Sequence, residues 1–285
     1  MSKTIVAIGA LGGSGTRAVA KVFLEMGVFM GDKLNISKDN LLFTILFKNP
    51  IWYRTSSKED KELRLRIFQK YMEGCELNLS ESNELDKAIS TNPTFKKRLN
   101  FNLKQTGYIN EKTNIWGWKE PNTQIFVSEI LNFFPQLKYI HILRHGIDMA
   151  FSNNNQQLNN WGWKYGIELS GNEDKNQIAT KQLEYWVKST KDVLAKIKVF
   201  NEKVLILNHS KFCTQPQQEI DRIIEFIGIP IKWEFKKKLY EIPKNKGTNN
   251  RYKDYDLTIF SQGNLQFVKE CGFNIEINES RDDDM

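Results

Sequence analysis

The chain has 285 residues, of which 40% are hydrophobic and 12% aromatic, and carries a formal net charge of +7 at pH 7. This composition excludes a fibrous or largely disordered chain and provides enough apolar residues for a full-sized core. The positive charge favours anionic ligands, but the basic residues are dispersed instead of clustered, so nucleic acid is not the expected partner.

The cysteines and the apolar stretches bear on where the protein works. Cys75, Cys213 and Cys271 are odd in number and far apart, which indicates neither a disulfide framework nor a CxxC metal site. The apolar run at the N-terminus is too short for a signal peptide, and no stretch approaches the roughly 18 apolar residues of a membrane span. We therefore expect a cytoplasmic protein, whose oligomeric state the sequence leaves open.

The N-terminal segment predicts a buried strand, a glycine-rich turn and a helix. The β-branched run KTIVAIGA covers residues 3–10, and GALGGSGTR covers residues 9–17. Apolar residues then recur at helical spacing at Val19, Val22, Phe23 and Met26. Backbone N–H groups that glycines expose at a helix N-terminus form an anion-binding site.

The rest of the chain alternates between helical and strand patterns. Residues 34–114 are polar and contain no clear strand, so we expect a largely helical insertion there. Two further buried strands are predicted over residues 138–144 and 203–210. A helix with isoleucines along one face follows at residues 216–228, and the acidic tail of residues 279–285 is expected to be loose.

Strands that alternate with helices predict an α/β fold, in which a mostly parallel sheet lies between two layers of helices. We expect one domain over residues 1–278. Ligands bind beyond the carboxyl ends of the strands in such sheets, so the loops after Ile8, Arg144 and Asn208 should meet at one edge.

The glycine loop differs from the loop of ATP-binding enzymes. The pattern GxxxxGK[ST] requires a lysine for the outer phosphates, and this loop contains none. Enzymes that use magnesium nucleotides also tend to have an aspartate after a second buried strand, where this chain has Arg144. The combination favours direct binding of a phosphate by arginine without a metal, and it disfavours a kinase.

Four segments, in family order, resemble the sulfotransferases that use 3′-phosphoadenosine 5′-phosphosulfate (PAPS). GGSGTRAVAKVF resembles their 5′-phosphosulfate loop, with a GTRA core similar to that of the heparan-type members. FPQLKYIHILRHGIDMAFSN resembles the 3′-phosphate motif. VLILNHSKFCTQPQQEIDRIIEFIGIP resembles the later strand and helix, and NKGTNNRYKDY resembles the C-terminal loop over the 3′-phosphate. The resemblance implies a sulfotransferase fold related to that of P-loop NTPases.

The resemblance also implies which residues bind the donor. The 5′-phosphosulfate is expected on the loop, and the 3′-phosphate on Arg144, on Ser152 eight positions later and on the C-terminal loop. The adenine needs a flat apolar partner, whatever the family, and Trp118, Trp163, Trp186 and His209 are candidates for it. In full, the expected donor-binding residues are Gly12, Gly13, Ser14, Gly15, Thr16, Arg17, Arg144, Ser152, His209, Lys246, Gly247 and Arg251.

The resemblance identifies the catalytic residues less clearly than the donor-binding residues. Many members of the family carry Lys or Arg at the position of Gly13, and this chain lacks that cation. Lys119 in WGWKEPNT is the favoured cation for the leaving oxygen, and Arg17 is expected at the phosphosulfate. A carboxylate is expected to take the proton of the acceptor. Asp39 is preferred for this role, with Asp32 and Glu120 as alternatives.

The sequence therefore predicts a PAPS-dependent sulfotransferase that transfers a sulfonate in line to a hydroxyl, or to an amine, without a metal. The acceptor is expected to be a small molecule or a glycan. The alternatives are a P-loop kinase of a nucleotide or small molecule, and an inactive module that binds only the desulfonated donor, PAP.

Overall fold

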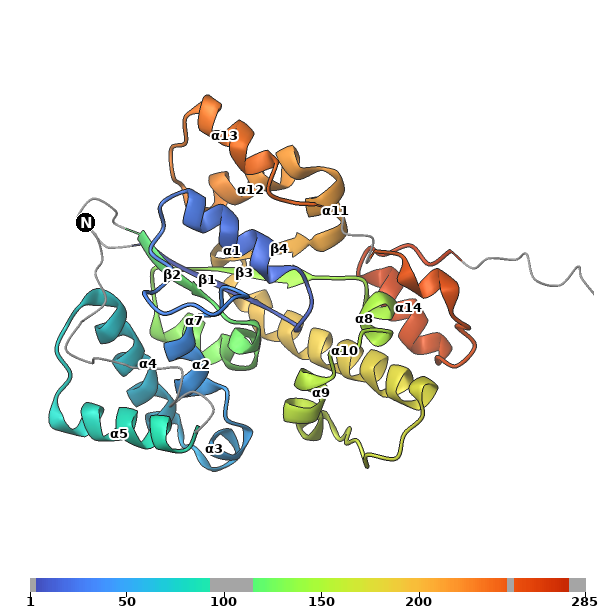
Figure 1. Ribbon diagram of the computed structural model, residues 1–285, viewed down its shortest axis with the longest axis horizontal. Helices are drawn as coiled ribbons and strands as arrows, with labels where there is room; N and C mark the ends of the chain where they lie inside the picture. The colour runs from blue at the N-terminus through green and yellow to red at the C-terminus, as the bar shows by residue number, and fades with distance from the viewer. Residues whose placement is uncertain (1–3, 93–114, 245–248, 277–285) are drawn as a thin grey trace, which may run out of the picture.

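The computed structural model describes residues 4–92, 115–244 and 249–276. Its centre is a parallel sheet in the order β2-β1-β3-β4 (Figure 1). The strands span Thr4–Ala10 (β1), Ile115–Lys119 (β2), Leu137–Leu143 (β3) and Val204–Asn208 (β4). The acidic tail expected over residues 279–285 lies outside the described residues, as do residues 93–114 of the expected insertion.

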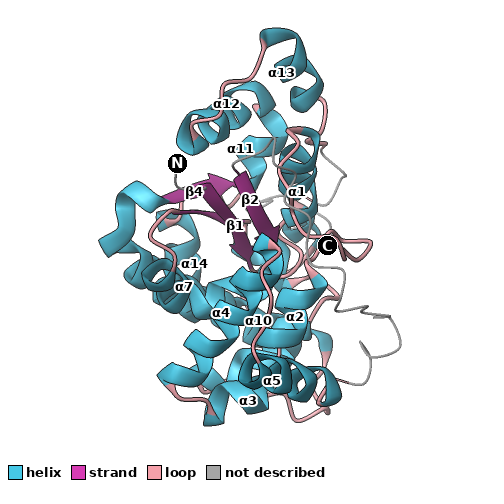
Figure 2. Cartoon of the chain, turned by 90° about the vertical axis from the view of Figure 1, so that its left-hand side faces the viewer, coloured by secondary structure: helices cyan, strands magenta, loops and turns pink. Residues whose placement is uncertain are grey.

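Helices cover both faces of the sheet, which confirms the predicted three layers (Figure 2). The upper layer in Figure 1 contains α1 (Thr16–Glu25), α11 (His209–Thr214), α12 (Pro216–Ile227) and α13 (Trp233–Tyr240). The helices below or beside the other face are α2 (Leu41–Phe47), α3 (Pro50–Thr55), α4 (Lys58–Glu73), α5 (Leu79–Ser90), α7 (Val127–Phe133), α8 (Gly146–Ala150), α9 (Gln156–Trp161), α10 (Lys175–Ile197) and α14 (Gln262–Glu270). Short 3-10 helices are η1 (Pro121–Phe126), η2 (Gly162–Tyr165), η3 (Lys198–Lys203) and η4 (Arg251–Asp254).

Alternate residues of the central strand pack into two separate cores. Val6 and Ile8 of β1 join the core below α1 and α12, whereas Ile5 and Ala7 join the core of α2, α4, α7 and α10. This alternation is the two-residue period of a strand that is buried on both faces. The predicted isoleucine face of α12 lies in the first of these cores.

The strand β2 is one that the sequence analysis did not predict. It has five residues, IWGWK, with a glycine at its centre. A side-chain carbon on Gly117 would lie 2.2 Å from the carbonyl oxygen of Val6, so only glycine lets β2 approach β1 this closely. The neighbours Trp116 and Trp118 both point into the lower core. The pairing places Lys119 at the end of a strand instead of in a loop, opposite Ile8.

The described part of the insertion is helical, with α2, α3, α4 and α5 over residues 41–90. Asn40, Asn49, Ser57 and Asn78 cap the starts of these helices with side-chain hydrogen bonds. None of the helices in the described part of the chain has the length and apolar character needed to cross a bilayer.

Candidate functional site

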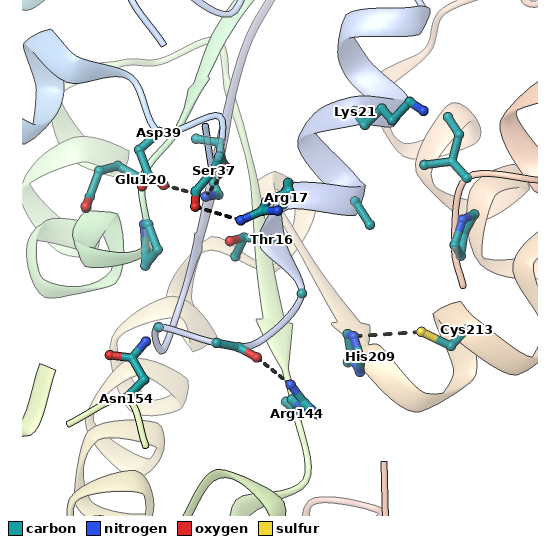
Figure 3. A pocket seen from close by; sticks show the side chains of 18 of the residues that line it. Thr16, Arg17, Lys21, Ser37, Asp39, Glu120, Arg144, Asn154, His209 and Cys213 are labelled. Carbon is teal, nitrogen blue, oxygen red and sulfur yellow. Dashed lines mark hydrogen bonds and ion pairs between the residues drawn. The ribbon is translucent and has the colours of Figure 1, made fainter. Parts of the chain in front are cut away.

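A cleft of about 1430 Å³ opens at the carboxyl ends of the strands, where the topology predicts a ligand. The glycine loop follows β1, Lys119 ends β2, Arg144 follows β3 and His209 follows β4. Lys119, Arg144, His209 and the glycines Gly12, Gly13 and Gly15 line the cleft; Figure 3 shows Arg144 and His209 beside the turn before α1. The loops that the sequence analysis expected at one edge of the sheet are therefore brought together.

The glycine loop has a backbone that only glycine adopts without strain. Gly13 and Gly15 have φ values of 89° and 81°, and Gly15 precedes the first turn of α1. A side-chain carbon on Gly15 would lie 2.2 Å from Cδ2 of His209. Thr16 and Arg17 line the cleft with Gly12, Gly13 and Gly15, so amides at the start of α1 face the space that an anion would occupy.

Ser14 differs from the other loop residues because its side chain is buried and lies 3.9 Å from the sulfur of Met149. It is absent from the residues that line the cleft. Its backbone amide donates a hydrogen bond of 3.2 Å to the carbonyl oxygen of Leu11, so the structure directs neither polar group of Ser14 at the cleft.

Arg144 joins the end of β3 to the glycine loop. Its Nη1 donates a hydrogen bond of 2.6 Å to the carbonyl oxygen of Gly13, and its own carbonyl accepts one of 3.1 Å from the indole of Trp186. Burial lowers the pKa of Arg144, but a guanidinium keeps its charge at neutral pH. Arg144 therefore places a fixed positive charge beside the glycine loop, where the sequence predicted that this residue binds a phosphate.

The other residues expected at the 3′-phosphate are placed less directly. The helix α8 ends at Ala150, so Ser152 lies beyond its end, and the Oγ of Ser152 accepts a hydrogen bond of 3.3 Å from the amide of Asn154. Ser152 does not line the cleft. Arg251 lies in η4, and its charge contributes to the lowered pKa of Arg144. Lys246 and Gly247 lie outside the described residues.

His209 is the aromatic side chain that the structure places in the cleft. Burial, assisted by the charge of Arg144, lowers its pKa to about 4, so the ring is neutral at physiological pH. The indoles of Trp118 and Trp186 are buried in the core, and Trp163 packs against Arg54. None of these three tryptophans lines the cleft. Among the four candidates, His209 is therefore the one placed to stack on the adenine ring of the donor.

At the end of the cleft opposite Arg144, the side chains of Lys119 and Arg17 contact the short loop of residues 35–39. Nζ of Lys119 is paired with the carboxylate of Asp39 and donates a hydrogen bond of 2.9 Å to the carbonyl oxygen of Ser37. Nη2 of Arg17 donates one of 2.9 Å to Oγ of Ser37 (Figure 3). Lys119 is 2% exposed and its Nζ is held by Asp39 and Ser37, so its charge is fixed at the edge of the cleft that it lines.

Asn35 holds this loop in shape. Its side chain donates to Oδ2 of Asp39 at 2.8 Å and accepts from the amide of Asp39 at 2.9 Å. Lys38, between them, has a φ of 64°, which is unusual for a residue with a side chain. The carboxylate of Asp39 is thereby aimed at Lys119.

The other two candidate carboxylates are separated by the fold. Asp32 accepts a hydrogen bond of 3.1 Å from the hydroxyl of Tyr71 and does not line the cleft. Glu120 does line it, and accepts bonds of 2.6 Å and 2.9 Å from the backbone and side-chain amides of Asn122. Burial raises the pKa of Glu120 to about 7. Asp39 and Glu120 therefore remain as candidates for proton transfer.

The sequence analysis missed a group of polar residues that complete the cleft. Lys48 follows the end of α2, Asn122 lies in η1, Asn154 lies before α9, and Gln156 and Gln157 begin α9. No motif marks these residues, because packing of the insertion against α9 brings them together. In the part of the chain that the structure describes, no cluster of three or more His, Cys, Asp or Glu residues could hold a metal ion.

Comparison with known proteins identifies a family to which the chain is similar. A model described as "Sulfotransferase family" matches residues 44–234, more than half of the chain, although not the glycine loop itself. No curated protein matches.

Solved structures share the fold at low sequence identity. The sulfotransferase domain of the Synechococcus PCC 7002 olefin synthase has a TM-score of 0.54 at 12% identity, over 96% of this chain and 95% of that one. The sulfotransferase domain from the curacin biosynthetic pathway has 0.55 at 13%, over 97% and 99%. The sulfotransferase STF9 from Mycobacterium avium has 0.52 at 13%, over 97% and 78%. These matches confirm the predicted fold.

Proposed function

The chain belongs to the sulfotransferase family, and we propose that it transfers a sulfonate from PAPS to a hydroxyl group of an acceptor. One observation carries the choice of donor. The guanidinium of Arg144 contacts the glycine loop at 2.6 Å, so an anion-binding turn and a fixed cation share one cleft. PAPS carries anionic groups at both the 5′ and the 3′ position, and these two features match them.

The donor would use both features at once. In this proposal the 5′-phosphosulfate lies on the amides of Gly13, Gly15 and Thr16 beside Arg17, and the 3′-phosphate lies on Arg144. Ser152, Arg251, Lys246 and Gly247 remain proposed partners of the 3′-phosphate. The adenine would pack against the neutral ring of His209.

Transfer would require no group beyond the side chains of the cleft. The acceptor oxygen attacks the sulfur, the bond between sulfur and the phosphate oxygen breaks, and PAP leaves with the electron pair. Lys119 stabilises the charge that develops on the leaving oxygen, and Arg17 stabilises the sulfonate. The proton of the acceptor passes to Asp39, which Asn35 holds in position. Glu120 is the alternative base.

Labelled PAPS tests this function directly. Wild-type protein incubated with [35S]PAPS and a metabolite extract should transfer the label to an acceptor, and Lys119→Met should transfer far less. Retained PAP binding without transfer to any acceptor would instead support an inactive binding module. Tight binding of Mg-ATP without binding of PAP would support a kinase.

A further inference from the structure

The backbone around Arg251 is held by a buried carboxylate in the helix that follows Arg144. Asp148 of α8 accepts a hydrogen bond of 2.9 Å from the amide of Asn250 and one of 3.3 Å from the amide of Tyr252. These two amides flank Arg251, the first residue of η4. Asp148 is 2% exposed, and Figure 1 shows the C-terminal residues beside α8. A charge so far removed from water needs such donors, so the contact fixes the segment to α8.

Aromatic stacks add to this attachment. The ring of Tyr252 stacks on that of His145, the residue before α8, with centroids 4.5 Å apart and an angle of 18° between the planes. The hydroxyl of Tyr252 donates to the carbonyl oxygen of Asn274 at 3.1 Å, and Nε2 of His145 donates to the same oxygen at 3.0 Å. Tyr255 stacks on Phe151 with centroids 3.9 Å apart. The position of η4 relative to α8 is therefore determined by contacts within the described residues.

This attachment brings the charge of Arg251 close to Arg144. Burial is the main cause of the lowered pKa of Arg144, the charge of Arg251 lowers it further, and the charge of Asp148 raises it. Both neighbouring charges therefore act on the guanidinium of Arg144. The two arginines repel each other, and the carboxylate of Asp148 offsets part of that repulsion. A phosphate dianion would gain from both positive charges at once.

We infer that Asp148 is a positioning residue that holds Arg251 near Arg144, so that the charges of both arginines act on the 3′-phosphate of the donor. The inference rests on the proposed function, because that function supplies the 3′-phosphate. Neither Asp148 nor Arg251 lines the cleft, so Arg251 acts on the phosphate through its charge. Asp148 acts only through the backbone of residues 250–252, because its own negative charge would repel a phosphate.

Replacing Asp148 by asparagine separates positioning from a direct effect of charge, because the two effects have opposite signs. Asparagine offers one accepting oxygen in place of two, so one of the backbone amides loses its partner. Loss of the negative charge alone would instead tighten the binding of PAP. In calorimetry, Asp148→Asn should raise the Kd for PAP at least about fivefold and the Kd for adenosine 5′-phosphosulfate, which lacks the 3′-phosphate, less than about twofold.

Two further variants show whether the effect is specific. Asp256→Asn is the matched control, since Asp256 is exposed and accepts a hydrogen bond of 2.8 Å from the amide of Thr258 within the same C-terminal segment. It should change neither Kd by more than about twofold. Arg251→Gln should itself weaken PAP binding at least about fivefold, and Asp148→Asn should add less than about twofold in that background, because its effect passes through Arg251.

A change in the segment itself tests the same attachment without altering Asp148. Asn250 has a φ of 63°, a backbone conformation that glycine adopts freely and a β-branched residue does not. Asn250→Val should therefore bind PAP at least about threefold more weakly than Asn250→Gly. This pair keeps the inference testable if Asp148→Asn does not fold.

Several results would overturn the inference: PAP binding by Asp148→Asn that is as tight as in wild type or tighter, equal losses for the two nucleotides, additive losses in the double variant, or equal affinity of the two Asn250 variants. Wild-type affinity of Arg251→Gln for PAP would overturn it as well. If the wild-type protein does not bind PAP, the proposed function is wrong instead.

Discussion

Replacing Glu120 by glutamine should destabilise the protein near pH 4 and stabilise it near pH 8. Burial raises the pKa of Glu120 from its ordinary 4.5 to about 7. Between these two values the folded protein holds a proton that the unfolded chain has lost, so the free energy of unfolding falls as the pH rises. Above the folded pKa the full cost of the buried carboxylate is present, and a shift of this size corresponds to about 3 kcal/mol.

The hydrogen bonds of Glu120 set the net effect of the substitution. Its two oxygens accept from the backbone and side-chain amides of Asn122 at 2.6 Å and 2.9 Å, whereas glutamine offers one oxygen. One donor then loses its partner, at a cost of about 1 kcal/mol. Glu120→Gln should therefore be about 1 kcal/mol less stable than wild type near pH 4 and about 2 kcal/mol more stable near pH 8.

Urea unfolding of both proteins at the two pH values measures this difference. Glu234→Gln removes an exposed carboxylate from the first turn of α13 and serves as the control, for which the difference from wild type should stay constant. Parallel pH profiles for wild type and Glu120→Gln would show that the buried carboxyl does not hold its proton to neutral pH, and the argument from burial would be wrong.

Three further substitutions test the donor site. Lys119→Met should lower kcat in [35S]PAPS kinetics by about 100-fold or more, because Lys119 acts on the leaving oxygen. The Kd for PAP should change by less than about threefold. An unchanged kcat would contradict that role. Gly15→Ala should weaken PAP binding in calorimetry, because a left-handed backbone costs a residue with a side chain about 1–2 kcal/mol and the new carbon meets His209. The double variant with His209→Ala should recover part of the affinity. Wild-type affinity in the single variant would count against a role of the loop in binding. Arg144→Gln should weaken the binding of PAP at least about tenfold more than it weakens the binding of adenosine 5′-phosphosulfate, which lacks the 3′-phosphate. Equal losses of affinity for the two ligands would argue against a 3′-phosphate at Arg144.

The sequence predicted those parts of the fold that local patterns determine. Glycines between an apolar run and a helical pattern are sufficient to predict the turn at Gly15, and the isoleucine period is sufficient for α12. The position of Arg144 followed from the end of a buried strand. Each of these signals lies within about fifteen residues of chain.

Features that depend on distant packing were not predictable in the same way. The strand β2 is short and is explained by the fit of Gly117 over Val6. The inward turn of Ser14 and the displacement of Asp32 from the cleft depend on Met149 and Tyr71, which are far away in sequence.

The polar residues that line the cleft near Lys48 are the clearest example of this limit. Lys48 and Gln156 are 108 residues apart and meet only in the folded chain. A motif search therefore finds the expected donor residues and misses this part of the cleft.

The central claim is that one cleft binds PAPS at both ends, through the glycine loop and Arg144. A crystal structure of the protein soaked with PAP tests it most directly. The account predicts the 5′-phosphate on the amides of Gly13, Gly15 and Thr16 and the 3′-phosphate on the guanidinium of Arg144. A nucleotide bound elsewhere, or a cleft left empty at saturating PAP, would contradict it.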